Sequence, residues 1–368
     1  MAIIMLTKHY QLEGFNINYP MHTIDIVSKI LFIDIETTGL SPIDHSIYMI
    51  GLSYYQGNSW CVTQLFAENI SEESLILKQL QDFLQGYDTI IHFNGNRFDL
   101  PFIQQRALLH NLSIDFDHMQ GIDLYKRIYA LRNLIVLPNY TQKTLEQYLG
   151  VNRKDRYTGR DLIKAYAQYH AMPSLPLLDM MYQHNLDDIK GLLYLVPILA
   201  YSELLKSTTK IKKVQMHTTQ NFETDTVHEL LLTLHTLTPL PRQITCCKND
   251  CFLTASEHIV TIKVPVYHTE LKYFYKNYKD YYYIKELDNA FHKSVSNFAD
   301  RSILEQATAA TCYTRKVSIY LRQFEQLTTP VYKKHYKDQE SYFEITDDTR
   351  TDRELLKNYA LHIIRMML

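Results

Sequence analysis

The first third of the chain alternates short apolar runs with amphipathic segments. Residues 29–36 (KILFIDIE) are apolar and β-branched, which predicts a buried strand. Strand-like runs follow at 47–55 and 59–67, and the connection Gln56-Gly57-Asn58 between them suits a hairpin. A short apolar run at 89–93 predicts a fourth strand.

Helices are predicted between and after these strands. Ser71, followed by two glutamates, has the character of an N-cap for a helix that reaches about Gln85. A second helix is expected from about Leu100 to His110, with Pro101 in its first turn. This order predicts an α/β fold, in which helices flank a mixed sheet with an antiparallel hairpin at one edge.

Residues 120–206 have a mostly helical pattern. A run at 144–149 ends at Gly150, and Gly159 precedes a helix that reaches about Ala171. The last apolar stretch, from about Leu177 to Leu205, predicts one long helix that Pro197 kinks.

The polar, basic segment 207–213 (STTKIKK) predicts a boundary between domains of residues 1–206 and 214–368. In the second domain residues 260–284 have strand character, and helices are expected near 287–325 and 352–368. We therefore expect a second, α+β domain whose function the pattern does not indicate.

Charge and composition exclude few classes of binding partner. The formal net charge is −2, which permits a nucleic-acid partner without arguing for one. No apolar run approaches the 18 to 20 residues that a membrane span needs, and the N-terminus lacks the pattern of a secretory signal. We expect a cytoplasmic protein with reduced thiols. Protein partners are not predictable from the sequence.

One cysteine cluster is a weaker metal candidate. Cys246, Cys247 and Cys251 lie close together, with His258 and His268 nearby. Their spacing matches no standard zinc motif, so we expect no structural metal there.

Two carboxylates interrupt the first apolar strand. Side chains alternate along a strand, so Asp34 and Glu36 point to the same face. Two neighbouring anions are costly in a buried strand, and a bound divalent cation would compensate them. The alternative is a solvated strand end at which they cap Thr37-Thr38-Gly39.

Further acids follow at Asp99 and Asp188. Asp99 stands where a loop enters a helix, and its alternative role is an ordinary N-cap. In the segment HNLDD, Asp188 shares a helix face with His184 and with buried leucines, whereas Asp187 falls on a wetter face. The geometry therefore favours Asp188 as the functional residue.

Together these segments resemble the three motifs of the DEDD superfamily of 3′–5′ exonucleases. The motifs are FIDIETTGL with Asp34 and Glu36, HFNGNRFDLPFI with Asp99, and HNLDDIKGLLYL with Asp188. Residues 137–151 and 184–195 look most like the YprB-type ribonuclease H-like branch, and the resemblance covers about residues 28–205. It departs from the family at His184, which lies four residues before Asp188, where family members carry a tyrosine at four or a histidine at five. We favour His184 with Asp188, and Asp187 remains the alternative ligand.

The resemblance implies a ribonuclease H-like domain that hydrolyses phosphodiester bonds with two Mg²⁺ or Mn²⁺ ions and releases nucleoside 5′-monophosphates. It implies catalytic roles for Glu36 and His184. The implied metal ligands are Asp34, Glu36, Asp99 and Asp188, and the implied substrate-binding residues are Thr37, Gly39, Leu40, Asn94 and Arg97. Asp123, another acid in an apolar segment, is expected to be a helix N-cap.

Three functions remain open at this stage. The first is an exonuclease on single-stranded or 3′-ended DNA or RNA. The second is a structure-specific endonuclease, and the third is a non-catalytic nucleic-acid-binding module. In the second domain, residues 271–285 interleave tyrosines with lysines, which suits single-stranded nucleic acid. We favour the alternative of a tyrosine-rich hairpin that turns at Lys276-Asn277.

Overall fold

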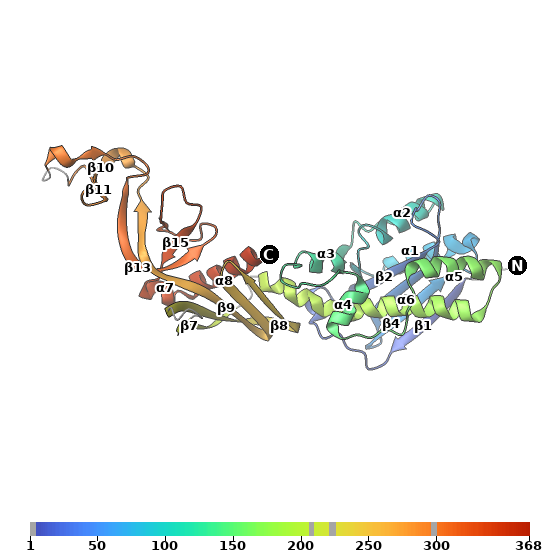
Figure 1. The fold of residues 1–368 in the computed structure, drawn as a ribbon. Coiled ribbons are helices and arrows are strands. Elements are labelled where there is room, and N and C mark those ends of the chain that lie inside the picture. Colours follow the sequence, from blue (N-terminus) through green and yellow to red (C-terminus); the bar gives the residue numbers. More distant parts are fainter. Residues whose placement is uncertain (1–4, 206–209, 221–225, 296–299) are drawn as a thin grey trace. The chain divides into compact units, whose positions relative to one another are not determined.

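The structure is a computed structural model that describes residues 5–205, 210–220, 226–295 and 300–368 (Figure 1). These residues divide into two compact units. Unit 1 comprises Met1–Ser202 with Thr238–Arg242, and unit 2 comprises Glu203–Leu237 with Gln243–Leu368. The boundary predicted at 207–213 falls partly on residues 206–209, outside the described residues. The division into domains of 1–206 and 214–368 stays a prediction.

Unit 1 is built on a six-stranded mixed sheet with strand order β1-β4-β3-β2-β5-β6. Strands β1 to β4 pair with one another in antiparallel fashion, whereas β5 runs parallel to β2 and β6 parallel to β5. The strands are β1 (Leu6–Leu12), β2 (Ile30–Thr37), β3 (Ile47–Gln56), β4 (Ser59–Phe66), β5 (Thr89–His92) and β6 (Gln120–Asp123).

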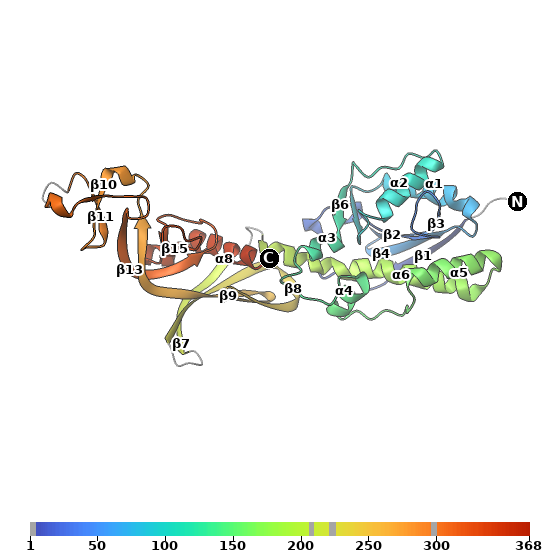
Figure 2. The ribbon, with the colours of Figure 1, turned by 45° about the horizontal axis from the view of Figure 1, so that its top comes forward.

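Helices cover both faces of this sheet, as Figure 2 shows. Helices α1 and α2 pack on one face together with Leu31 and Ile33, and α5 and α6 pack on the other. The odd residues of β2 therefore face α1 and α2, which leaves Asp34 and Glu36 on the α6 face. The helices are α1 (Glu73–Leu84), α2 (Asp99–Leu109), α3 (Leu124–Tyr129), α4 (Gln142–Leu149), α5 (Gly159–Ala171) and α6 (Leu175–Leu195).

Several helix ends follow the predicted chemistry. Gly150 takes a positive φ of 83° at the end of α4, where a side chain would be strained. Asp123 caps α3 by accepting from the Lys126 backbone N–H, as predicted. The α-helical part of α6 ends at Leu195, and residues 196–205 continue as a 3-10 helix, because Pro197 cannot donate to the preceding turn.

Some predictions for unit 1 were wrong. Strands β1 and β6 were not predicted, and β6 lies in the segment expected to be mostly helical. Ser71 is not an N-cap, since it lies inside a 3-10 turn that spans Ile70–Glu72. The hairpin after β3 is tighter than expected, because Gln56 pairs with Ser59 and the two residues between them both take positive φ.

Unit 2 consists mainly of antiparallel strands. One sheet has the order β13-β15-β14-β9-β8-β7 with an added β13–β9 pairing, and a small sheet has the order β11-β10-β12. Its strands are β7 (Lys210–Gln220), β8 (Thr226–Lys248), β9 (Cys251–Phe274), β10 (Tyr281–Ile284), β11 (Asn289–His292), β12 (Glu305–Gln306), β13 (Tyr313–Gln323), β14 (Tyr332–Lys333) and β15 (Ser341–Glu344). Its α-helices are α7 (Asp347–Thr351) and α8 (Arg353–Met367).

The predicted α+β character and the final helix at 352–368 are confirmed, but the helices near 287–325 are wrong. Most of β13 pairs with β9, from Tyr313 opposite Phe274 to Tyr320 opposite Tyr267. The same pairing excludes the hairpin predicted at Lys276-Asn277, because β9 pairs with β13 and β14 and β10 belongs to the small sheet.

Two further observations concern the cysteines and the membrane. None of the five cysteines forms a disulfide, and Cys246, Cys247 and Cys251 do not converge with a histidine into a metal-binding group among the described residues. None of the helices in the described ranges is long and apolar enough to cross a membrane.

Candidate active site

Strand β2 carries the first two acids into the space between the sheet and α6. Glu36 is 8% exposed and Asp34 is partly buried. Asn185 of α6 donates from its Nδ2 to Asp34 Oδ2 (3.1 Å) and accepts at its Oδ1 from Gln64 Nε2 (2.9 Å). A Cβ on Gly51, which pairs with Asp34, would lie 2.4 Å from Asn185 Oδ1. Glycine at this position therefore leaves room for the amide that orients Asp34.

Asp99 enters the site from the first turn of α2 and is 7% exposed. Its Oδ1 accepts from the Ile35 backbone N–H at 3.3 Å, which fixes it against β2. The N-cap position belongs to Phe98, and no side chain caps this helix. The alternative of an ordinary N-cap is therefore wrong, and the carboxylate of Asp99 is directed to the strand that carries Asp34 and Glu36.

Helix α6 supplies the third motif. His184 Nε2 lies 3.1 Å from Asp188 Oδ2 and 3.8 Å from Glu36 Oε1. Asp187 points elsewhere, because its Oδ2 accepts from the backbone N–H groups of Lys154 (3.1 Å) and Asp155 (2.8 Å). The structure therefore brings Asp188 to the other acids and uses Asp187 to hold the loop between α4 and α5.

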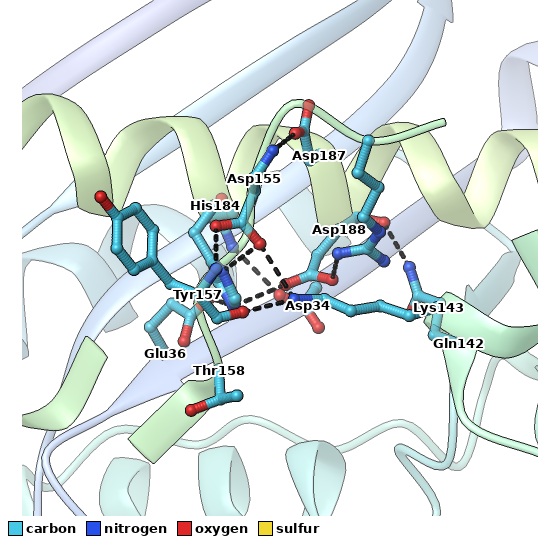
Figure 3. Close-up of polar contacts among 12 residues, drawn as sticks. Asp34, Glu36, Gln142, Lys143, Asp155, Tyr157, Thr158, His184, Asp187 and Asp188 are labelled. Carbon is cyan, nitrogen blue, oxygen red and sulfur yellow. Dashed lines mark hydrogen bonds and ion pairs between the residues drawn. The ribbon is translucent and has the colours of Figure 1, made fainter. Parts of the chain in front are cut away.

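That loop contributes two residues that the sequence did not reveal (Figure 3). Asp155, whose side chain is 1% exposed, accepts from His184 Nδ1 at 2.8 Å and from Lys143 Nζ at 3.1 Å. Arg153 binds Asp188 Oδ1 through Nη1 at 2.5 Å and forms a second ion pair with Glu146 of α4. Asp155 thus fixes the ring of His184, and Arg153 fixes the carboxylate of Asp188.

A close approach of two helices makes the Arg153 pair possible. Gly191 of α6 faces α4, and a Cβ there would lie 1.9 Å from Glu146 Oε1 and 2.5 Å from Gln142 Nε2. Gln142 also donates to the Asp188 backbone carbonyl at 2.8 Å. A glycine inside a helix was the one local signal in the sequence for this contact.

Electrostatics set this cluster apart from ordinary ion pairs. Burial raises the pKa of Glu36 to about 8 and the pKa of Asp99 to about 7, with further contributions from the charge of Asp188. Burial and the charges of Asp188, Glu36 and Asp99 raise the pKa of Asp34 well above its usual value. Like charges thus destabilise one another here unless a cation compensates them.

His184 responds in the opposite sense. Burial acts to lower its pKa, but the hydrogen bond and charge of Asp188 and the charges of Glu36 and Asp155 outweigh burial and raise the pKa to about 9. Burial acts to raise the pKa of Asp188, and the contacts with His184 and Arg153 outweigh it and lower that pKa. His184 is consequently protonated at neutral pH as long as these acids carry their charge.

The donor set fits a divalent cation. One ligand atom from each of Glu36, His184 and Asp188 lies within 4.8 Å of the others, and in the described part of the chain no other such group occurs. Asp34 and Asp99 add carboxylates with raised pKa beside this group. Carboxylate oxygens are the ligands that Mg²⁺ and Mn²⁺ prefer.

A cleft of about 440 Å³ opens over these groups. Among the predicted substrate-binding residues, Thr37 and Leu40 line it, and Leu40 is 79% exposed. Thr37 Oγ1 donates to the Gly39 carbonyl at 2.7 Å, which holds the turn that presents Leu40. A Cβ on Gly39 would lie 2.2 Å from the His45 ring, so only glycine fits this turn without displacement.

Asn94 and Arg97, which were also predicted to bind substrate, do not line the cleft. Asn94 takes a positive φ of 59° and donates its backbone N–H to Asp123 Oδ1 at 2.9 Å, so it shapes the loop after β5. Arg97 is exposed. The structure adds Arg160, an exposed residue of α5 that lines the cleft.

Comparison with known proteins identifies the domain. Residues 31–200 match the family model of the ribonuclease H superfamily. This part of the chain is a ribonuclease H-like domain. The match confirms the domain predicted over residues 28–205, and a cluster of buried acids in such a domain supports a nuclease that acts on nucleic acid.

Solved structures give weaker likenesses. A family B DNA polymerase from the archaeon Pyrobaculum calidifontis is 19% identical, with a TM-score of 0.39 over 49% of this chain and 25% of the polymerase. E. coli exonuclease I in complex with a 5cy-dA13 oligonucleotide is 11% identical, with a TM-score of 0.33 over 57% of this chain and 55% of the exonuclease. The chain thus spans about a quarter of the first protein and about half of the second. Likenesses at this level carry no argument about activity. None of the curated proteins compared with the chain matches it significantly.

Proposed function

We propose that the chain is a metal-dependent 3′–5′ exonuclease that releases nucleoside 5′-monophosphates from single-stranded or 3′-ended DNA or RNA. The observation that carries this proposal is the convergence of Asp34, Glu36, Asp99, Asp188 and His184 beside one cleft. The motif resemblance gives the direction of cleavage. The exposed Leu40 at the cleft supports the exonuclease proposal, since a large apolar side chain there suits contact with a terminal base.

In this proposal Asp34, Glu36, Asp99 and Asp188 hold two Mg²⁺ or Mn²⁺ ions. When bound, such ions lower the pKa of an attacking water and stabilise charge on the departing 3′ oxygen. His184 orients the water and accepts its proton at Nε2. Because the charges of Glu36 and Asp188 keep His184 protonated, compensation of those charges brings its pKa down toward neutrality. Asp155 keeps the Nδ1–H in place, so Nε2, which pairs with Asp188 in this structure, is the atom that would accept the proton once a cation holds Asp188.

The remaining roles are assigned by position. Thr37, Gly39 and Leu40 contact the terminal nucleotide, and Arg160 faces its phosphate across the cleft. Asn94 and Arg97 contact the strand farther out. We also propose a reducing location such as the cytoplasm, in keeping with five cysteines that form no disulfide, and a separate, nucleic-acid-selecting role for residues 214–368.

The test is a time course on single-stranded DNA and RNA labelled at either end, with Mn²⁺ or EDTA. The full-length chain is compared with Asp34→Asn and with Asp179→Asn, an exposed acid on the same helix as Asp188. Mononucleotides released from the 3′ end, dependent on Mn²⁺ and lost only in Asp34→Asn, are the expected result. Internal fragments would identify an endonuclease instead, and absence of any cleavage together with absence of Mn²⁺ binding would leave a binding module.

A further inference from the structure

A row of aromatic rings extends from the loop that precedes Asp99. Phe93 meets Tyr125 edge-on at 5.7 Å, Tyr125 stacks on Tyr129 at 5.4 Å with an interplanar angle of 21°, and Tyr140 meets Tyr129 edge-on at 5.4 Å. The guanidinium of Arg132 lies over the Tyr129 ring at 5.0 Å. We call these five residues the aromatic ladder.

The ladder begins at the edge of the sheet that carries the active site. Strands β2, β5 and β6 run parallel, so Glu36, Phe93 and α3 all follow the carboxyl ends of their strands. Asp123, which caps α3, accepts from Asn94, and its charge raises the pKa of Asp99. Helix α3 is six residues long, so Tyr129 lies about 9 Å farther along it.

The packing of α3 does not require these exposed rings. Leu124 and Ile128 are fully buried and attach the helix to unit 1, whereas Tyr129 is 42% exposed. The Tyr140 hydroxyl donates to the backbone carbonyls of Ile135 (2.6 Å) and Arg132 (3.1 Å), which fixes the turn between α3 and α4. Tyr129 is therefore the exposed ring of the ladder, and the half-buried rings of Phe93, Tyr125 and Tyr140 support it.

The exposed charged side chains beside the ladder are all positive. Residues 124–145 contain no aspartate or glutamate, and Lys126, Arg127 and Arg132 are all exposed. Arg97, in the loop that follows Phe93, is exposed as well. Alternating ring faces and cations match a strand whose bases are unpaired and whose phosphates are spaced along it. A duplex would offer phosphates but no base faces.

We propose that the aromatic ladder binds the unpaired nucleotides of a single strand next to those held in the cleft. The proposal rests on the proposed nuclease function and adds its substrate class, a single strand several nucleotides long. A base stacks on the Arg132 guanidinium, which lies over the Tyr129 ring, and the neighbouring cations Lys126 and Arg127 contact phosphates.

The test measures binding and cleavage separately. Fluorescence anisotropy follows a labelled 15-nucleotide single strand, DNA or RNA, with the full-length Asp34→Asn chain in EDTA at several salt concentrations. Tyr129→Leu should weaken binding about 5- to 100-fold with an unchanged salt slope, because stacking is lost and phosphate contacts stay. Arg127→Gln, which removes a phosphate contact, should weaken binding and reduce the slope of log K against log salt by about 1.

Two matched variants control for packing. Tyr129→Phe keeps the ring and should bind as the parent does. Tyr194→Leu removes a ring in the same unit that is 41% exposed and meets Phe15, and it should bind as the parent does as well. In the chain with Asp34 intact, Tyr194→Leu should cleave a dinucleotide, too short to reach the ladder, at the parental rate.

The outcomes separate the two proposals. Parental affinity in Tyr129→Leu, or equal losses in Tyr129→Leu and Tyr194→Leu, would overturn the ladder and leave the nuclease standing. Ladder-dependent binding without cleavage of any substrate would overturn the nuclease and leave the ladder standing. Equal affinity for a blunt duplex and the single strand would also overturn the ladder, since a duplex exposes no base faces.

Discussion

The two units bury ionisable groups in different ways. Unit 1 encloses many acids, among them Glu36, Glu73, Asp99, Asp123, Glu146, Asp155 and Asp187, whereas Glu203 is the buried acid in the described residues of unit 2. Both units cluster buried tyrosines, with Tyr48 and Tyr166 in one core of unit 1 and Tyr320, Tyr332 and Tyr342 in one core of unit 2. A buried hydroxyl needs one hydrogen bond, but a buried carboxylate needs a cation or several donors. The acids of unit 1 therefore require an explanation that the tyrosines do not.

Within unit 1 the buried acids form two classes. Glu73 accepts from Arg106, His110 and the Ile47 backbone, and its pKa is lowered. Asp34, Glu36 and Asp99 face one another, and their pKa values are raised. Glu73, in the first class, stabilises the fold. The acids of the second class destabilise the fold, and we propose that they serve to bind a cation. Substitutions should therefore act with opposite signs in the two classes.

The largest expected effect is that of Asp34→Asn on catalysis. Loss of this carboxylate should reduce nuclease activity about 1,000-fold, which corresponds to the several kcal/mol that a bound metal contributes. In EDTA the same variant should unfold at a higher temperature than the parent, because one of the mutually repelling acids becomes neutral. The measurements are initial rates with Mn²⁺ and thermal unfolding in EDTA, with Asp179→Asn as control. A lower unfolding temperature would place Asp34 in the stabilising class.

Glu73→Gln should have the converse effect. The carboxylate is fully buried between α1, α2 and the start of β3, and removing its charge leaves Arg106 without its partner. Breaking a buried pair of this kind costs about 3 to 5 kcal/mol. Urea unfolding measures the loss, and Asp82→Asn, an exposed acid on the same helix, should change stability little. A loss no larger than that of the control would show that this pair contributes no stability.

The contrast between the classes also decides what a sequence can reveal. Local periodicity placed β2 to β5, α2, α4 and α5, because their apolar patterns and turn residues are self-contained. It missed β6, which is only four residues long. It also predicted helices where β13 pairs with β9, because pairing with a strand about 40 residues away produces no local pattern of apolar and polar residues. The motifs predicted that Asp34, Glu36, Asp99, His184 and Asp188 form one site, and the structure brings these five side chains together.

Asp155, Arg153 and Asn185 could not be found in the same way. Their roles depend on the loop after α4 folding back onto α6, and on Asn185 crossing to β2 over Gly51. Such contacts join residues 29 to 151 positions apart. The only traces in the sequence are two glycines: a Cβ on Gly51 would collide with Asn185, and a Cβ on Gly191 would collide with Glu146, the partner of Arg153.

The pH dependence of metal-induced stabilisation sharpens the comparison further. Glu36 and Asp99 have pKa values raised to about 8 and about 7, so without metal they lower stability as pH rises from about 4 to 8. His184, with its pKa raised to about 9, loses its contribution as pH rises from about 6.5 through 9, which is the same direction. Saturating Mn²⁺ should therefore raise the unfolding temperature by about 5 to 10 °C at pH 8.5 and by less at pH 6. A shift that does not grow with pH, or that persists in Asp34→Asn, would place the cation elsewhere.

A smaller effect is expected for Asp155→Asn, which keeps a side chain of the same size but lowers the basicity of the group that orients His184. Loss of such a partner reduces activity about 10- to 100-fold. Because the charge of Asp155 helps to raise the pKa of His184, that pKa should also fall. Steady-state rates and NMR titration of the His184 ring in EDTA measure the two effects. Reduced activity with an unchanged titration would mean that Asp155 acts only through the loop it holds.

The smallest effect is expected in unit 2, where the polar contacts of tyrosines are structural. Tyr283 donates to Asp288 Oδ1 at 2.6 Å, and Tyr313 donates to the same oxygen. Tyr283→Phe removes one of two donors to a partly exposed carboxylate, so it should destabilise the chain by about 1 kcal/mol. Cleavage of a dinucleotide should stay at the parental rate, because this contact supports a small sheet and no acid cluster. A large loss of activity without a loss of stability would overturn the division drawn between the units, since it would make a tyrosine of unit 2 part of the catalytic apparatus.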